Sequence, residues 1–183
     1  KCLEESSLKI SDLDAVSVSK GPGSYTGLRI GVSLAKGICF GANIPLISTP
    51  TLTSMAFSPK LSDTKDMYYV PMLDARRMEV YACVLNQDKE EVQSTSAIVV
   101  EENSFAQFLE THPVVFFGPG MDKCKAIFEN SENAYFVSDI LPSAAQMIKI
   151  SARKYETESF ESVAYFEPFY LKDFVAGKPK KLL

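Results

Sequence analysis

The longest helical pattern in the sequence, from Ser24 to Phe40, has two apolar faces, and this limits the possible folds most. At about 100° per residue, one face holds four side chains: Leu28, Val32, Ala35 and Cys39. A second face, about 130° away, holds Ile30, Leu34 and Ile38 together with Gly27 and Gly31. The whole arc is about twice as wide as one sheet contact needs. We therefore expect either another helix of this chain or another protein to cover the second face.

A glycine-rich turn, Gly21-Pro22-Gly23-Ser24-Tyr25-Thr26-Gly27, joins a short strand at 15–19 to this helix. Backbone amides in such a turn can cradle a phosphate. The Walker pattern is absent, however, and Thr26 stands where the dinucleotide pattern needs its third glycine. Two interpretations stay open. Either the glycines only permit a tight turn that Ser24 caps, or Gly21 and Gly23 lie near a nucleotide.

Strand and helix patterns alternate on both sides of one linker, Ser58 to Asp63. The expected strands are 15–19, 44–49, 68–74, 79–85, 97–100, 114–117 and 135–137. The expected helices are 24–40, 51–57, 104–110, 121–129 and 143–157, the last with Ala144, Met147, Ile148 and Ala152 on one face. This alternation predicts an α/β protein with two lobes, residues 1–57 and 58–183. Lys1 to Leu8 is typical of the end of a helix, so we expect that an N-terminal part of the first lobe is missing.

Charge and composition argue against several classes of protein. Nineteen basic and twenty-three acidic residues give a net charge of −4, which is unlike a stand-alone nucleic-acid binder. No apolar run reaches the roughly 18–20 residues of a membrane span, and no signal-peptide pattern opens the chain. The four cysteines form no Cys-x-x-Cys pair, and His112 is the single histidine. The sequence thus predicts no disulfide framework, no metal site and a cytoplasmic protein without membrane contact.

Three further positions are candidates for function. Asp74 ends a strand in front of Arg76 and Arg77, and it either orients a ligand or pairs with an arginine. Gly118 and Gly120 follow another buried strand, where they form either a simple turn or a contact with a nucleotide. Lysines near the C-terminus, at 178, 180 and 181, either meet the phosphates of a nucleic acid or lie in solvent.

The sequence resembles the TsaB (YeaZ) family, which is glycoprotease-like (peptidase M22-like). The resemblance is carried by Asp12-Leu13-Asp14-Ala15-Val16, by Gly21 to Gly31, and by Ala35-Lys36-Gly37. It continues through Ile44 to Ser48, Asp74 to Tyr81, and Pro168 to Leu171. It implies a two-lobed actin/Hsp70/sugar-kinase-like (ribonuclease H-like) fold, here with an incomplete first lobe. It also implies a part in forming N6-threonylcarbamoyladenosine at position 37 of tRNAs that read codons beginning with A.

Within that resemblance, the residues differ from those of the catalytic paralogue TsaD. The His-x-x-x-His metal site of TsaD-like proteins falls here on Thr51 and Met55, and neither side chain is a suitable ligand. Asp74 to Met78 replaces the Ser-Gly-Gly-His-Thr hairpin of TsaD-like proteins. The resemblance therefore implies a subunit without catalytic residues, metal or bound cofactor of its own. ATP and a metal ion are implied for TsaD instead.

The implied partners are TsaD in a heterodimer, the ATPase TsaE within the same complex, and a second copy of this chain. tRNA is reached only through the complex. The expected partner interface comprises Tyr25, Gly27, Leu28, Ile30, Gly31, Leu34 and Ile38. Positions expected near a nucleotide, if one binds, are Gly21, Gly23, Asp74, Gly118 and Gly120.

Two other functions stay open as alternatives. One is a nucleotide-binding enzyme of the same fold, either a kinase or an ATP hydrolase. The other is a peptidase, which is less well supported because the chain has no His-Glu-x-x-His motif and His112 is its one histidine.

Overall fold

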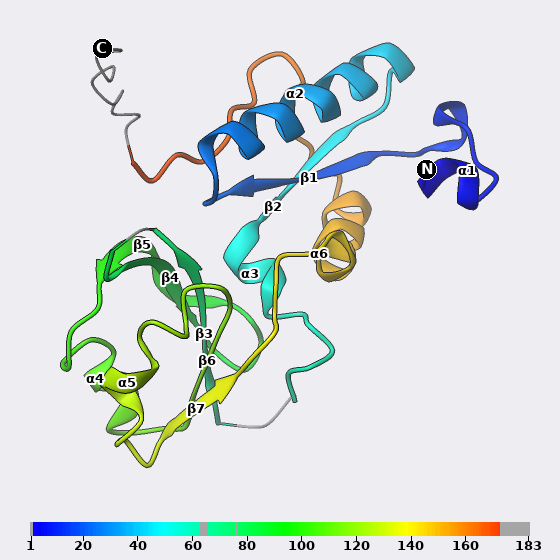
Figure 1. The fold of residues 1–183 in the computed structure, drawn as a ribbon. Helices are drawn as coiled ribbons and strands as arrows, with labels where there is room; N and C mark the ends of the chain where they lie inside the picture. The colour runs from blue at the N-terminus through cyan, green and yellow to red at the C-terminus, as the bar shows by residue number, and fades with distance from the viewer. Residues whose placement is uncertain (1, 63–65, 76, 173–183) are drawn as a thin grey trace, which may run out of the picture.

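The chain forms two β-sheets that a short helix connects (Figure 1), in a computed structural model that describes residues 2–62, 66–75 and 77–172. The first sheet has two parallel strands, β1 (Val16–Gly21) and β2 (Leu46–Pro50). The second has five strands in the order β5-β4-β3-β6-β7. Helix α3 (Thr51–Met55) follows β2 directly and contacts strands of both sheets. The expected two-lobed α/β architecture is confirmed.

The two-stranded sheet lies between two long helices. Helix α2 (Tyr25–Ala42) packs on one face and helix α6 (Ala144–Glu156) on the other (Figure 1). Ser24 caps α2, since its hydroxyl accepts a hydrogen bond from the Gly27 amide at 3.4 Å. The side chains that α2 buries are those predicted for its sheet-facing side: Leu28, Val32, Ala35 and Cys39. Helix α1 (Cys2–Glu5) and the 3-10 turn η1 (Ile10–Asp12) precede β1.

The C-terminal part of the described chain returns to the first sheet. The Ser151 hydroxyl donates to the Ser17 hydroxyl at 2.7 Å, so α6 is fastened to β1. Beyond α6, the Phe169 amide donates to the carbonyl oxygen of Lys20 at 2.7 Å. Helix α6 therefore packs on the sheet of the first lobe, although the sequence groups it with residues 58–183. The division of the chain into 1–57 and 58–183 stays a prediction.

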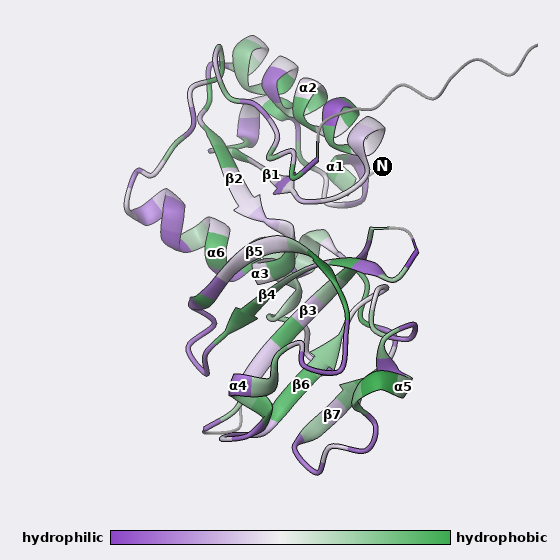
Figure 2. Ribbon diagram, turned by 90° about the vertical axis from the view of Figure 1, so that its left-hand side faces the viewer, coloured by the Kyte–Doolittle hydropathy of each residue, from purple (hydrophilic) through white to green (hydrophobic). Residues whose placement is uncertain are grey.

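The five-stranded sheet combines a meander with a parallel group. Strands β3 (Tyr68–Asp74), β4 (Glu79–Leu85) and β5 (Glu91–Val99) are antiparallel, whereas β6 (Val114–Phe117) and β7 (Ala134–Val137) run parallel to β3. Residues around the short helices α4 (Ala106–Leu109) and α5 (Lys125–Phe128) pack on one face, and α3 packs on the other. The inner strands β4 and β6 are hydrophobic, whereas the edge strand β5 is paler in Figure 2.

Several element boundaries differ from the predicted ones. Strand β5 begins at Glu91 rather than at residue 97, because its pairing with β4 extends over a mainly polar segment. The helix expected at 104–110 starts later, at Ala106, since Phe105 has a left-handed backbone with φ of 64°. Over the ranges that the structure describes, no helix combines the length and the apolarity that crossing a membrane requires.

Candidate functional site

The second apolar face of α2 is open to solvent. Ile30 and Leu34 are each 64% exposed, and Ile38 is half-buried. At the C-terminal end of this face, Ile10 of η1 and the residues around Gly37 form a groove of about 710 Å³. A Cβ atom added at Gly37 would meet no other atom within 4 Å, so another backbone could approach closely there. The helix thus presents a continuous apolar surface that the described chain leaves accessible.

Not every expected interface residue lies on this surface. Leu28 is 9% exposed, so it offers little surface to a partner, and its place in the interface stays a prediction. Tyr25 is half-buried, with its ring centroid 5.1 Å from that of Tyr170. Gly27 is exposed, and Gly31 is half-buried with Val18 Cγ2 3.9 Å from where its Cβ would lie.

The glycine turns sit where two backbones cross closely. Gly21 has φ of +110°, and its Cβ would lie 2.7 Å from the carbonyl oxygen of Phe169. Gly118 has φ of +102°, and its Cβ would overlap the carbonyl oxygen of Met72. A Cβ at Gly120 would lie 2.9 Å from the carbonyl carbon of Leu73. These contacts explain the glycines as packing positions, and a nucleotide near them stays a prediction.

Asp74 lies at the same end of the second sheet as Gly118 and Gly120, whereas Gly21 and Gly23 lie at the end of β1. The Lys123 ammonium group donates to Asp74 Oδ1 at 2.6 Å and to the Arg77 and Glu79 carbonyl oxygens at 2.8 and 2.5 Å. A lysine that follows β6 therefore holds the β3–β4 hairpin. This contact with Lys123 was not expected from the sequence, and Arg76 lies outside the described residues.

The two positions that align with metal-binding histidines serve packing and hydrogen bonding here. The hydroxyl groups of Thr51 and Ser19 share a hydrogen bond at 2.5 Å. Met55 is fully buried in the core between α3 and the five-stranded sheet. Within residues 2–62, 66–75 and 77–172, no group of three His, Cys, Asp or Glu side chains is placed to hold a metal ion.

The four cysteines differ in exposure, which predicts their reactivity. Burial raises the pKa of Cys83 to about 12, and burial also raises the pKa of Cys39 and Cys124. Because the thiolate is the nucleophile, we expect Ellman's reagent at pH 8 to modify Cys2, which is exposed, in the folded protein. The other three thiols should react only after unfolding in guanidinium. Rapid modification of more than one thiol without denaturant would contradict this expectation.

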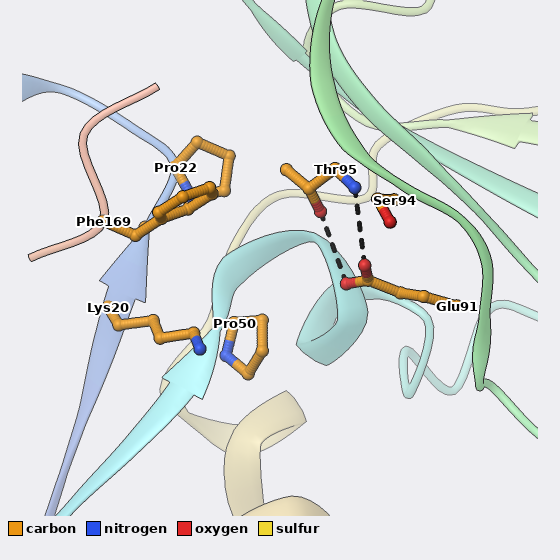
Figure 3. A pocket seen from close by; sticks show the side chains of 8 residues that line it. Lys20, Pro22, Pro50, Glu91, Ser94, Thr95 and Phe169 are labelled. Carbon is orange, nitrogen blue, oxygen red and sulfur yellow. Dashed lines mark hydrogen bonds between the residues drawn. The ribbon is translucent and has the colours of Figure 1, made fainter. Parts of the chain in front are cut away.

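A pocket of about 210 Å³ lies between the lobes at the ends of β1 and β2 (Figure 3). Its lining residues are Lys20, Gly21, Pro22, Pro50, Glu91, Ser94, Thr95 and Phe169. Of these, the sequence singled out the glycine turn and Phe169, which lies in the Pro168 to Leu171 segment that carries the family resemblance. The others come from segments far apart in the chain, and no motif marks them. The one available signal was the position of Lys20 at the carboxyl end of a buried parallel strand.

Comparisons with known proteins agree with the family resemblance. Residues 1–180 match the family model described as TsaD, tRNA N6-adenosine threonylcarbamoyltransferase. The tRNA threonylcarbamoyladenosine biosynthesis protein TsaB of Escherichia coli K12 is 29% identical, over 96% of this chain and 78% of its own length. TsaB of Haemophilus influenzae is 30% identical over 96% and 77%. In contrast, the tRNA N6-adenosine threonylcarbamoyltransferase of Chromobacterium violaceum matches only 35% of this chain and 19% of its own.

Two solved structures from Pseudomonas aeruginosa have the same fold. A protein with similarity to peptidase YeaZ superposes with a TM-score of 0.76 at 21% identity, over 93% of this chain and 79% of that one. YeaZ superposes with a TM-score of 0.69, also at 21% identity, over 92% and 79%. The expected actin/Hsp70/sugar-kinase-like fold is thereby supported. With TsaB relatives matched over nearly its whole length, the chain belongs to the TsaB (YeaZ) family.

Proposed function

We propose that this protein is a non-catalytic subunit of a tRNA-modifying complex and binds the threonylcarbamoyltransferase TsaD through the second face of α2. The observation that carries the proposal is the 64% exposure of both Ile30 and Leu34. They lie on a helix whose other apolar face is already buried within the first lobe. Contiguous apolar surface of this kind marks sites of protein association. The pathway in this proposal, formation of threonylcarbamoyladenosine in tRNA, is taken from the names of the TsaB relatives.

A paralogue is the partner that this surface suits best. Residues 1–180 match the family model of the transferase, so TsaD and this chain share one architecture. A helix of TsaD that corresponds to α2 can then pack against α2 around an approximate two-fold axis. The open position at Gly37 allows the two helices to approach closely. TsaE and tRNA would join through the TsaD subunit.

The proposed lack of catalysis rests on the chemistry of the side chains. Thr51 and Met55 are a hydrogen-bonded hydroxyl group and a buried thioether, which cannot replace two imidazole ligands. In this proposal ATP and the metal ion bind to TsaD. A kinase or ATP hydrolase of the same fold is not favoured, since the relatives matched over most of the chain carry the TsaB name.

Charge placed on the open face tests this proposal. We expect Leu34→Arg and Gly31→Arg each to weaken TsaD binding by about a hundredfold or more, because an unpaired guanidinium would be buried in an apolar interface. Affinity is measured by calorimetry with purified TsaD. The threonylcarbamoylation of tRNA by the mixture should fall in parallel.

Ile148→Arg on α6 is the matched control, since Ile148 is also 64% exposed on a helix surface. This variant should bind TsaD with unchanged affinity. Leu34→Arg and Ile148→Arg should unfold within about 0.5 kcal/mol of the parent protein, as is usual for surface substitutions, because both side chains are 64% exposed. Undiminished TsaD binding by both α2 variants would refute the proposed interface.

A further inference from the structure

We propose that the pocket between the lobes binds a small zwitterion of the α-amino-acid class, with its carboxylate at Lys20 and its ammonium group at Glu91. The pocket lies at the carboxyl ends of the parallel strands β1 and β2, a common place for ligands in open α/β sheets. Its walls come from four separate segments of the chain, so a ligand there would connect the two lobes (Figure 3).

The wall formed by the first lobe is positively charged. Lys20 is half-buried, and among the described residues its ammonium group makes no hydrogen bond or ion pair. Burial lowers the pKa of Lys154 of α6, and the nearby positive charge of Lys20 lowers it further. The Lys154 ammonium group donates to the Ser48 carbonyl oxygen at 2.8 Å, which leaves Lys20 as the cation that faces the pocket. A carboxylate is the natural partner for such a group.

The opposite wall carries a carboxylate that its neighbours hold in place. Glu91 Oε1 accepts from the hydroxyl groups of Thr53 and Thr95 at 3.3 Å each, and Oε2 accepts from the Thr95 amide at 3.4 Å. These bonds are long, and the Glu91 side chain is exposed. Each carboxylate oxygen can accept further bonds, and an alkylammonium group offers three donors. Glu91 is therefore oriented but still able to bind a cation.

Size and polarity narrow the choice of ligand. The pocket of about 210 Å³ is smaller than the roughly 300–1,000 Å³ of sites for drug-sized ligands. Pro22, Pro50 and Phe169 supply apolar surface between the two charged walls. A nucleoside triphosphate is too large and too negative for this space, because Glu91 would repel it. A single amino acid with a modest apolar side chain matches both the charges and the volume.

Three related probes test the charge pattern in the full-length protein by ligand-observed NMR titration. L-leucine carries both charges, leucinamide lacks the carboxylate, and 4-methylpentanoate lacks the ammonium group. We expect L-leucine to bind with a Kd of about 1 mM, the affinity of a small, solvent-accessible ligand. The two singly charged analogues should bind about tenfold more weakly. Binding is measured without TsaD, so the result is independent of the proposed function.

Two variants assign the ends of the ligand. Lys20→Gln should weaken L-leucine binding about tenfold and make L-leucine and leucinamide equivalent. Glu91→Gln should instead make L-leucine and 4-methylpentanoate equivalent. Lys60→Gln and Glu110→Gln, which change charges outside the pocket lining, should leave all three affinities unchanged. Equal binding of the three probes, no binding of L-leucine at 20 times the expected Kd, or tighter binding of inorganic phosphate or ADP that Lys20→Gln abolishes would each overturn the proposal.

Discussion

Gly118→Ala is expected to lower the free energy of unfolding by about 3 kcal/mol or more. Two effects add in this variant. The backbone at Gly118 has φ of +102°, a conformation that costs a residue with a Cβ atom about 1–3 kcal/mol. The added methyl group would also overlap the Met72 carbonyl oxygen and lie 2.7 Å from Met55 Cε, and such overpacking typically costs about 1–3 kcal/mol. The turn after β6 would then have to move away from β3.

Urea unfolding followed by circular dichroism measures this loss. In a chain of 183 residues, a loss of about 3 kcal/mol should lower the melting temperature by roughly 10 °C. Gly37→Ala is the matched control, since a Cβ there meets nothing within 4 Å and the helical backbone suits alanine. The control should gain about 0.5–1 kcal/mol. A Gly118→Ala protein as stable as its parent would show that the backbones of β3 and β6 do not approach as closely as described.

Phe116→Ala is expected to cost about 3–5 kcal/mol, the usual range for removing a buried phenylalanine ring. Phe116 is fully buried on β6, between β3 and β7 of the five-stranded sheet. Its ring stacks on that of Phe128 with centroids 5.0 Å apart, and it meets the rings of Phe105 and Phe136 at 5.7 Å each. Truncation would remove the central ring of this cluster and leave a cavity beneath α5.

Tyr165→Ala serves as the control for Phe116→Ala. It also removes an aromatic ring, but Tyr165 is 86% exposed, so the change should stay within about 0.5 kcal/mol. The same urea titration compares the two variants. Equal effects of the two substitutions would contradict the burial described for Phe116.

The sequence predicts the burial of side chains best in elements that pack through a single apolar face. On α2, Val32 and Cys39 are buried and Leu34 is exposed, as the helical spacing requires. The same reasoning is wrong for α6, where Ile148 was assigned to the apolar face but is 64% exposed. The reason lies in the partner of α6: the first sheet presents the Ser17 hydroxyl and the Ser48 carbonyl oxygen, so polar residues of α6 turn toward it.

Of the two candidate sites, one can be predicted from the sequence and the other cannot. The open face of α2 can be predicted because its residues lie within one continuous helix. The pocket between the lobes cannot, because Lys20, Glu91 and Phe169 meet only when three distant segments come together. Strand β5, which supplies Glu91, is mainly polar at that end, and its pairing with β4 rather than its composition makes it a strand. Long-range pairing of this kind leaves no local periodicity.

The return of the C-terminal segment to β1 and β2 determines the order in which the two lobes can fold during translation. Strands β3 to β7 lie within residues 68–137 and can pair as soon as that stretch has left the ribosome. The first sheet is made earlier but is finished later, because Ser17 pairs with Ser151 and Lys36 with the carbonyl oxygen of Phe166. Until translation reaches these residues, one face of β1 and β2 has no α6 to cover it. The lobe that is synthesised first is therefore the last to close.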